Sequence, residues 1–376
     1  MKFKNLAYLL FIVFLASCRG DQYIIQKETE EITPPQNIAT IGFYLLNEGN
    51  MNSNKATLDY FDYTKGTYSR NIYAEANPNV IKEMGDVGND IKIYGSKMYV
   101  VVNASNKVEV LDSRTAKKIK SITVENGRYL AFANGKAYVS SYAGPISVDP
   151  KAPLGKVMEI DTISLSVTRE AVVGYQPEEM AVVKNKLYVA NSGGYRVPNY
   201  DRTISVIDLT NFKEATKYDV AINLNKLMAD TNGDLYVTSR GDYLTVSPNL
   251  FVVDSQTGAI KKTFNIPVGN FTIVNDKLYY LSNAFNYNTE TTVKSYGIID
   301  LKTKEIISKK LFSSEYEAKI EAPYGIAVNP ITEDLYITDA GNYVSTGSLY
   351  CFNKNGNFKW KTEGGNIPAH FAFLYK

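Results

Sequence analysis

A short phrase built around one tyrosine recurs along the chain and constrains its fold more than any other feature. In each copy a tyrosine precedes apolar or small polar residues, a composition typical of β-strands. Consecutive copies lie roughly 39 to 57 residues apart, the period of β-propeller blades rather than of helical or leucine-rich repeats. The seven copies begin at Tyr44, Tyr99, Tyr138, Tyr188, Tyr236, Tyr279 and Tyr336.

The residues around each tyrosine follow a fixed order of elements. An Asn-Gly or Asn-Asp turn, as at 134–135 or 275–276, precedes the tyrosine and supplies the positive φ of a tight hairpin. A short apolar strand precedes the turn, an alternating strand such as 203–208 follows a loop, and a fourth strand such as 305–308 follows a second turn. Four antiparallel strands in each of seven repeats predict an all-β, seven-bladed β-propeller.

The C-terminal residues indicate how the ring closes. Pro368 opens a segment that matches the segments opened by Pro177 and Pro323, and both of those begin an innermost strand. The first repeat lacks such a strand, because residues 41–44 already form its second strand. We therefore predict that the C-terminal strand joins blade one and closes the ring without a free edge.

The N-terminal residues have the pattern of a targeting segment. Lys2 and Lys4 precede a short apolar run at 6–15, and residues 15–18, Leu-Ala-Ser-Cys, resemble a bacterial lipobox. This resemblance implies a lipoprotein signal peptide at 1–17 and a lipidated Cys18; the alternative is an ordinary signal peptide with an incidental cysteine. We expect residues 18–40, which are polar and contain two adjacent prolines, to form a flexible tether, and residues 41–376 to form the propeller.

The charge balance limits the classes of partner. The chain has 41 Lys and Arg against 39 Asp and Glu, and removal of Lys2 and Lys4 with the signal peptide leaves it formally neutral. A neutral chain argues against nucleic-acid binding and against a polybasic membrane patch. We expect membrane contact through the lipid anchor only.

Few residues suit catalysis. His370 is the only histidine, which limits a His-based metal centre or a Ser-His-Asp hydrolase; we interpret it as a polar residue at the start of an inner strand, near the central channel. Cys351 is expected to be a buried strand thiol. We therefore expect no catalytic residue, metal or cofactor. Five residues with side-chain oxygens could converge near the axis: Glu48, Glu179, Asn191, Asn283 and Asp339. They could bind a hard cation such as calcium, or they could form structural hydrogen bonds.

Loop length differs between the two faces of the predicted ring. Long connections leave the second strands at 47–56, 140–156, 190–203, 238–249, 282–295 and 338–348, and all emerge on what we call the long-loop face. Long loops on a rigid scaffold concentrate binding residues, and these loops are rich in Tyr, Asn, Ser and Gly, as binding loops often are. The repeat tyrosines, in contrast, are interpreted as packing residues. The binding candidates from the loops are Tyr142, Tyr195, Arg196, Arg240, Tyr243, Phe285, Tyr287 and Tyr343, and those from the inter-blade connections are Asp86, Arg128, Tyr175, Tyr324 and His370.

The repeats at 173–177, 187–191 and 203–209 resemble the YVTN/YncE-type propeller repeat, and this resemblance extends over the whole chain after the tether. Together with the lipobox and the Tyr- and Asn-rich face, it makes the chain similar to the cobalamin-binding propeller lipoproteins of Bacteroidota vitamin B12 uptake loci. The resemblance implies an outer-membrane lipoprotein, facing the cell exterior, that binds cobalamin or a related corrinoid. It also implies transfer of that ligand to a TonB-dependent transporter.

Two other functions fit the same sequence. A cell-surface scaffold of the surface-layer type would use the propeller to hold a protein or glycan. A calcium-dependent propeller lactonase or lyase would need a cluster of oxygen ligands at the axis.

Overall fold

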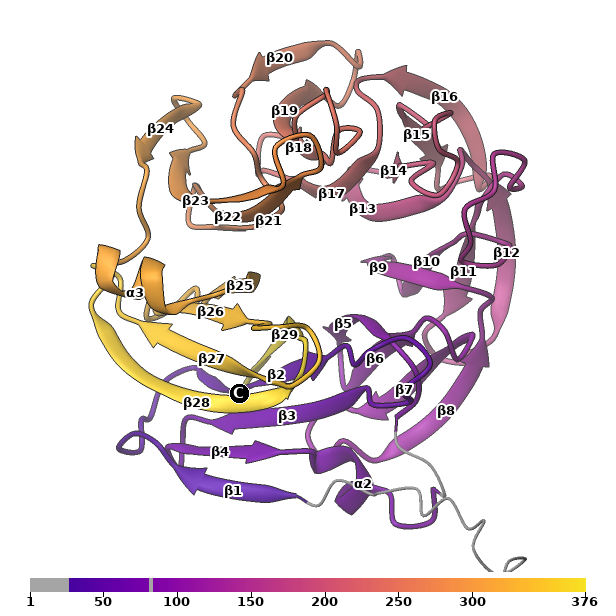
Figure 1. Ribbon diagram of the computed structural model, residues 1–376. Helices are drawn as coiled ribbons and strands as arrows, with labels where there is room; N and C mark the ends of the chain where they lie inside the picture. The colour runs from indigo at the N-terminus through magenta and orange to yellow at the C-terminus, as the bar shows by residue number, and fades with distance from the viewer. Residues whose placement is uncertain (1–26, 81–83) are drawn as a thin grey trace, which may run out of the picture.

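The computed structural model describes residues 27–80 and 84–376, which form a ring of blades around a central axis (Figure 1). The described strands make seven antiparallel sheets, which confirms the predicted all-β, seven-bladed propeller. Blade 1 contains β1 (Glu28–Glu31), β2 (Thr40–Asn47), β3 (Thr57–Asp62), β4 (Thr67–Arg70) and β29 (Pro368–Tyr375); blade 2 contains β5 (Gly88–Tyr94), β6 (Lys97–Val102), β7 (Lys107–Asp112) and β8 (Lys118–Thr123); blade 3 contains β9 (Gly127–Ala133), β10 (Lys136–Ser141), β11 (Lys156–Asp161) and β12 (Val167–Val172).

The remaining blades have four strands each. Blade 4 contains β13 (Pro177–Val183), β14 (Lys186–Asn191), β15 (Thr203–Asp208) and β16 (Lys213–Asp219); blade 5 contains β17 (Leu224–Ala229), β18 (Asp234–Ser239), β19 (Asn249–Asp254) and β20 (Ile260–Thr263); blade 6 contains β21 (Asn270–Val274), β22 (Lys277–Asn286), β23 (Thr291–Asp300) and β24 (Glu305–Ser308); blade 7 contains β25 (Pro323–Val328), β26 (Leu335–Asp339), β27 (Thr346–Phe352) and β28 (Phe358–Asn366).

The repeated tyrosine marks the second strand of every blade. All seven side chains are buried, which confirms their interpretation as packing residues. The hairpin turns before them have the expected backbone: Asn134 and Gly135 both have positive φ, as do Asn275 and Asp276. Such turns match the right-handed twist of the strands that they join.

The last strand closes the ring as predicted. β29 pairs with β2 in antiparallel register, with Phe43 opposite Phe373 and Leu45 opposite Phe371. Its other neighbours are the inner strands β25 and β5 of the two adjacent blades. Phe43 also contacts the ring of Tyr336 in blade 7, with centroids 4.8 Å apart. Blade 1 is therefore held together by residues from both ends of the described chain.

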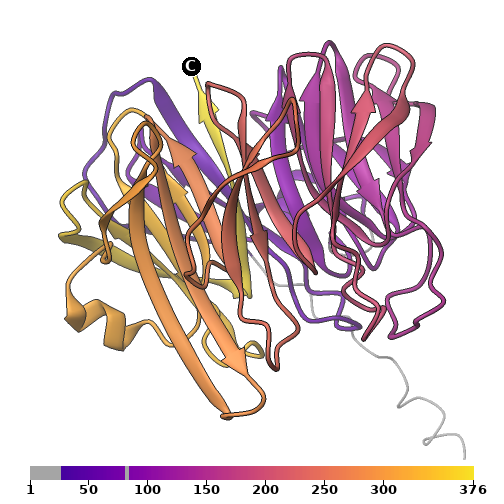
Figure 2. The ribbon, with the colours of Figure 1, turned by 90° about the horizontal axis from the view of Figure 1, so that it is seen from above.

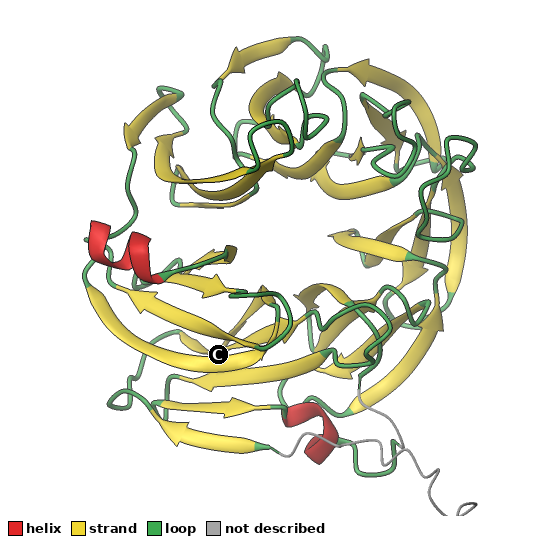
Figure 3. Cartoon of the chain, in the orientation of Figure 1, coloured by secondary structure: helices red, strands yellow, loops and turns green. Residues whose placement is uncertain are grey.

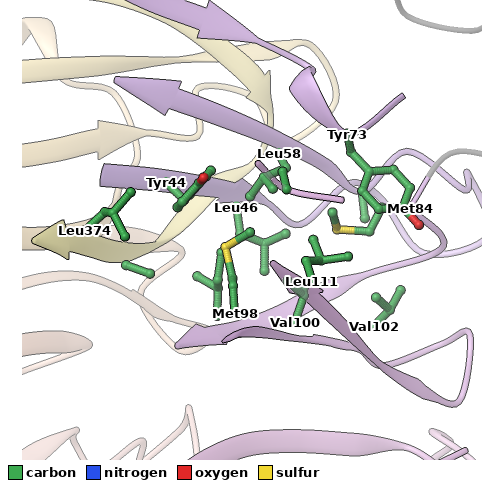
Figure 4. Close-up of a cluster of buried hydrophobic side chains, with 14 residues drawn as sticks. Tyr44, Leu46, Leu58, Tyr73, Met84, Met98, Val100, Val102, Leu111 and Leu374 are labelled. Atoms are coloured by element: carbon green, nitrogen blue, oxygen red, sulfur yellow. The ribbon is translucent and has the colours of Figure 1, made fainter. Parts of the chain in front are cut away.

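The hydrophobic core lies between adjacent blades. Figure 4 shows the cluster between blades 1 and 2, where Tyr44 and Leu46 of β2 face Met98 and Val100 of β6. A cluster of the same kind joins each further pair of neighbours around the ring. Cys351 lies on β27 within the cluster between blades 7 and 1, and burial raises the pKa of its thiol.

Part of the predicted tether is a strand. Residues 28–31 form β1, which pairs with β4 and adds a fifth, fully exposed strand to the outside of blade 1. The ordered domain therefore starts before residue 41, because the open edge of β4 offers backbone groups for pairing. The predicted signal peptide at 1–17, the predicted lipidation site Cys18 and the predicted tether residues up to 26 lie outside the described residues.

One predicted loop is a two-stranded arm. β22 and β23 remain paired from Lys277 opposite Asp300 to Asn286 opposite Thr291, so the segment 282–295 is a hairpin rather than an irregular loop. Figure 2 shows this arm projecting beyond the body on the long-loop face, while the C-terminus lies at the opposite face. We call residues 282–295 the blade 6 arm.

Two short helices lie outside the ring, α2 (Ile72–Ala76) between blades 1 and 2 and α3 (Ser314–Lys319) between blades 6 and 7 (Figure 3). Among the described residues, no helix has the length and apolar character needed to span a membrane.

Candidate functional site

A polar cavity of about 220 Å³ lies at the axis on the long-loop face; we call it the axial cavity. The starts of the inner strands and the ends of the second strands meet here, so blades 1, 3, 5, 6 and 7 all contribute lining residues. The lining residues that matter below are Glu48, Asn225, Lys226, Arg240, Asn283, Tyr324, Tyr343 and His370. A second cavity of about 450 Å³ continues along the axis and includes apolar residues such as Met180, Met228 and Phe371.

A buried carboxylate organises one side of the axial cavity. Glu178, at the start of β13, accepts hydrogen bonds from Arg128 (Nη2 to Oε2, 3.1 Å) and Arg240 (Nη1 to Oε1, 3.0 Å). The hydroxyl of Tyr142 donates to Oε1 of the same carboxylate at 2.7 Å. Burial opposes ionisation of Glu178, but the two guanidinium groups and these hydrogen bonds outweigh it and hold its pKa below the ordinary value. Three candidates, two from blade 3 and one from blade 5, thus share one anion.

A second polar cluster lies across the cavity. Glu48, directly after β2, is 2.8 Å from His370 (Oε1 to Nε2) and accepts a hydrogen bond from Tyr324 (Oη to Oε2, 3.0 Å). His370 therefore lies at the start of an inner strand beside the channel, as the sequence predicts. His370 lies on β29, and Glu48 directly follows β2. This cluster therefore also depends on ring closure.

Five predicted aromatic residues remain open to solvent on the long-loop face. Their exposed fractions lie between 37% and 63%, and they approach other rings in edge-on pairs. Tyr195 lies beside Tyr142 at 6.3 Å, Phe285 beside Tyr287 at 4.9 Å, and Tyr343 beside Tyr324 at 5.9 Å, measured between centroids. The exposed rings are Tyr195, Tyr243, Phe285, Tyr287 and Tyr343.

Three other candidates stabilise the loops themselves. Arg196 donates to the carbonyls of Pro150 and Asn199, and its guanidinium lies 3.5 Å from the ring centroid of Tyr175. Asp86 accepts hydrogen bonds from the backbone N–H groups of residues 52 and 54, at 2.7 and 3.3 Å. These contacts fix loop conformation around the cavity.

The five oxygen-bearing residues predicted near the axis do not form one cluster. Asn191 donates to Thr203 and Ser205, and Asp339 accepts from the backbone of residues 321 and 322, so both are occupied in local structure. Glu179 lies farther along the channel, whereas Glu48 and Asn283 line the axial cavity. In the described part of the chain, no group of three or more His, Cys, Asp or Glu side chains is arranged to hold a metal ion.

Sequence reasoning missed the residues at the centre of the site. Glu178, Lys226 and Asn225 lie on inner strands, whose positions near the axis follow from the repeat pattern. A signal was present, since Pro177 begins an inner strand and two glutamates follow it directly. Glu178, Asn225 and Lys226 thus share their position with the inter-blade candidates Arg128, Tyr324 and His370 at the starts of inner strands.

The model of the family described as "Domain of unknown function (DUF5074)" matches residues 41–374. No curated protein matches the sequence. Among solved structures, hydrazine synthase of Kuenenia stuttgartiensis is similar with a TM-score of 0.58 and 16% identity, over 71% of this chain and 77% of that chain. A quinonprotein alcohol dehydrogenase-like protein of Bacteroides thetaiotaomicron has a TM-score of 0.58 and 15% identity, over 90% of this chain and 79% of that chain. At these identities the similarity concerns the fold alone.

Proposed function

Since the chain belongs to the DUF5074 family, whose description assigns no activity, we propose from the geometry of its long-loop face that it is a binding protein for cobalamin or a related corrinoid. The protein captures its ligand without chemical conversion. It acts as a lipid-anchored protein of the outer membrane that faces the cell exterior and passes the corrinoid to a TonB-dependent transporter.

The observation that carries this proposal is the combination of exposed rings with a polar axial cavity. Tyr343 lines the cavity, and Tyr195 lies beside Tyr142, whose hydroxyl bonds Glu178. The rings of Tyr243, Phe285 and Tyr287 extend this surface outward along blades 5 and 6. A corrinoid is a wide disc fringed with amide groups. Such a disc suits apolar ring faces around a centre of hydrogen-bonding groups.

The pairing of charges within the site supports a ligand with little net charge. Arg128 and Arg240 share Glu178, while Glu48 is held by His370 and Tyr324. These carboxylates and guanidinium groups thus already have partners within the protein. The remaining groups on the face are hydroxyl, amide and backbone groups, which match amide side chains.

The lipid anchor and the transfer step rest on other grounds. The lipobox sequence that ends at Cys18 supports the anchor, and the resemblance of the repeats and of the loop composition supports the transporter.

Binding can be tested with a soluble form of the chain that begins at Lys27. This form is incubated with cyanocobalamin at micromolar concentration and applied to a sizing column, with absorbance followed at the wavelength of the red chromophore. We expect the chromophore to elute with the protein. Absence of co-elution would overturn the corrinoid proposal.

One observation favours a surface scaffold as the second candidate. Several apolar side chains on the long-loop face are strongly exposed, including Tyr287 at 63% and Val344 at 68%, and exposed apolar patches often mark protein interfaces. Retention of the protein by a cell-surface polysaccharide or protein, with no retention of cyanocobalamin, would favour this alternative.

A further inference from the structure

Lys226 is a charged residue of the site that contacts no carboxylate among the residues that the structure describes. It lies on β17, is only 9% exposed, and lines both the axial cavity and the channel beyond it. Within the described ranges, no carboxylate oxygen lies within 4.0 Å of its ammonium group, which instead lies 4.6 Å from the ring centroid of Tyr129. A buried ammonium without an ion-pair partner is unusual, because burial of a charge is costly.

The nearest carboxylates are engaged elsewhere. Oε2 of Glu179 accepts the backbone N–H of Leu227, and Lys92 lies 3.9 Å from Oε1 of Glu179 and 3.8 Å from Oδ2 of Asp90. Burial lowers the pKa of Lys226, but the attraction of Tyr129, Glu179 and Asp90 outweighs burial and raises it, so the amine remains protonated. The ammonium thus keeps its charge at the base of the axial cavity.

The cations around the axis differ in how closely carboxylates approach them. Arg128 and Arg240 both contact Glu178, and Lys92 lies within 4.0 Å of Glu179 and Asp90. The ammonium of Lys226 is attracted by Glu179 and Asp90 from a longer distance, so it is the cation of the axial cavity that a ligand anion can contact directly.

Further groups in the cavity lack a partner and could meet a ligand. The amide oxygen of Asn225 accepts a hydrogen bond from Arg240 at 2.8 Å, while its N–H groups make no hydrogen bond within the described ranges. Asn283 donates to the hydroxyl of Tyr343 at 3.2 Å, and its buried amide oxygen has no partner among the same residues. The cavity thus offers donors beside Lys226 and an acceptor at Asn283.

We propose that the axial cavity is an anion subsite in which Lys226, with Asn225, binds the phosphodiester of a corrinoid that carries a nucleotide loop. This inference rests on the proposed corrinoid function. It adds that the protein recognises the phosphodiester of the ligand. A cavity of about 220 Å³ is too small for a corrin ring but admits a phosphate group that projects from it. The disc then lies on the rings of the face, and Asn283 accepts a hydrogen bond from one of its amides.

The test compares cyanocobalamin with dicyanocobinamide, which has the corrin ring but lacks the nucleotide loop and its phosphodiester. Affinities are measured by titration calorimetry for the wild type, for Lys226→Met, and for Lys213→Met as an exposed control on β16. We expect Lys226→Met to weaken cyanocobalamin binding about tenfold or more, since a charge-assisted contact is lost, and to leave dicyanocobinamide within about twofold. Lys213→Met should change neither affinity.

Two further measurements keep the test independent of folding defects. Lys226→Arg retains the charge and should retain the preference for cyanocobalamin, and thermal unfolding reports whether each variant is folded. With the wild type, inorganic phosphate should compete with cyanocobalamin more strongly than chloride at equal ionic strength, but should not compete with dicyanocobinamide. If both corrinoids bind and neither Lys226→Met nor phosphate distinguishes them, the anion subsite is wrong and the corrinoid function stands. If neither corrinoid binds the wild type, both proposals fail.

Discussion

Glu178 shows how a single buried carboxylate connects several blades. Its side chain is fully buried and bonds Arg128 from β9, Arg240 after β18 and Tyr142 after β10. Removal of such a carboxylate leaves the charges of its buried partners unpaired, and this lowers the stability strongly. Replacement of the whole buried ion pair by apolar side chains would change the stability much less.

We predict that Glu178→Gln lowers the free energy of unfolding by about 3 kcal/mol, because two guanidinium groups lose their shared anion. Urea unfolding followed by circular dichroism measures this loss. The matched control is Glu170→Gln, which removes an exposed ion pair with Lys156 and should cost no more than about 0.5 kcal/mol. Equal effects of the two variants would contradict the central role of Glu178.

The same carboxylate predicts a dependence of stability on pH. The pKa of Glu178 in the folded protein lies below its ordinary value of 4.5, so its contribution is fully present above that value and is lost as pH falls through the folded pKa. The difference in unfolding free energy between wild type and Glu178→Gln should therefore narrow as the pH is lowered below about 4.5. A difference that stays constant from neutral to acidic pH would show that the charge of Glu178 is not responsible.

At this scale the sequence predicted the packing residues better than the site. The repeat tyrosines could be placed because they share one position in every blade, and a shared position implies a shared environment. Glu178 and Lys226 differ from the corresponding residues of other blades, so their partners depend on which blades face each other across the axis. That information comes from three-dimensional distances and not from the spacing of repeats.

Among the strands, the blade 6 arm is the element that departs most from the regular blade. Its two strands continue beyond the body of blade 6, and Tyr287 at its tip donates a backbone hydrogen bond to the carbonyl of Tyr243 in blade 5 at 3.1 Å. Beside it, a groove of about 340 Å³ is lined by Leu244, Phe285 and Val293 among others. The arm thus places apolar side chains farther from the body of the propeller than a short turn could.

We predict that the double variant Phe285→Ser and Tyr287→Ser weakens cyanocobalamin binding about tenfold or more, because exposed aromatic anchors carry much of the energy of a binding surface. The melting temperature should stay nearly constant, since both side chains are exposed. Titration calorimetry and thermal unfolding measure the two effects. Ile163→Ser removes an exposed apolar side chain on the opposite face and should leave binding intact; a loss of affinity in this control would mean that the arm has no special role.

The arm also shows why one predicted loop was wrong. The sequence pattern predicts a loop at 282–295 because these residues follow the tyrosine strand. However, Thr291, Thr292 and Val293 favour strands, and they lie at a distance that allows pairing with residues 284–286. Local β-propensity therefore favoured strands within this segment.

The whole molecule depends on the pairing of its last strand with its first blade. β29 occupies the inner position of blade 1 and contacts the inner strands of both neighbours, whereas β1 covers only the outer edge with four exposed residues. We therefore expect the ring to depend on the inner strand β29 and not on the outer strand β1.

We predict that a chain ending at Ile367 loses cooperative thermal unfolding and elutes at a larger apparent size. The deletion removes the buried Leu374 and the partly buried Phe371 and Phe373, and a fully buried side chain of this size contributes about 1.5–3 kcal/mol. It also leaves the edge of β2 unpaired, so the loss is a large part of the net stability of a typical domain. Size exclusion with light scattering and calorimetry measures the outcome. A chain that begins at Thr33 and lacks β1 is the matched control and should unfold within about 1 kcal/mol of the chain that begins at Lys27. A cooperative, monomeric form of the shorter C-terminal variant would show that the ring does not need β29.

Ring closure also sets the order in which the protein can mature. The strand that completes blade 1 is made after the other strands of the propeller, so the edge of β2 stays unpaired while the seven repeats emerge. A premature stop just before β29 is then as harmful as one near the middle of the propeller, although the other strands have been made. Folding of each copy therefore waits for residues 368–375, which form β29.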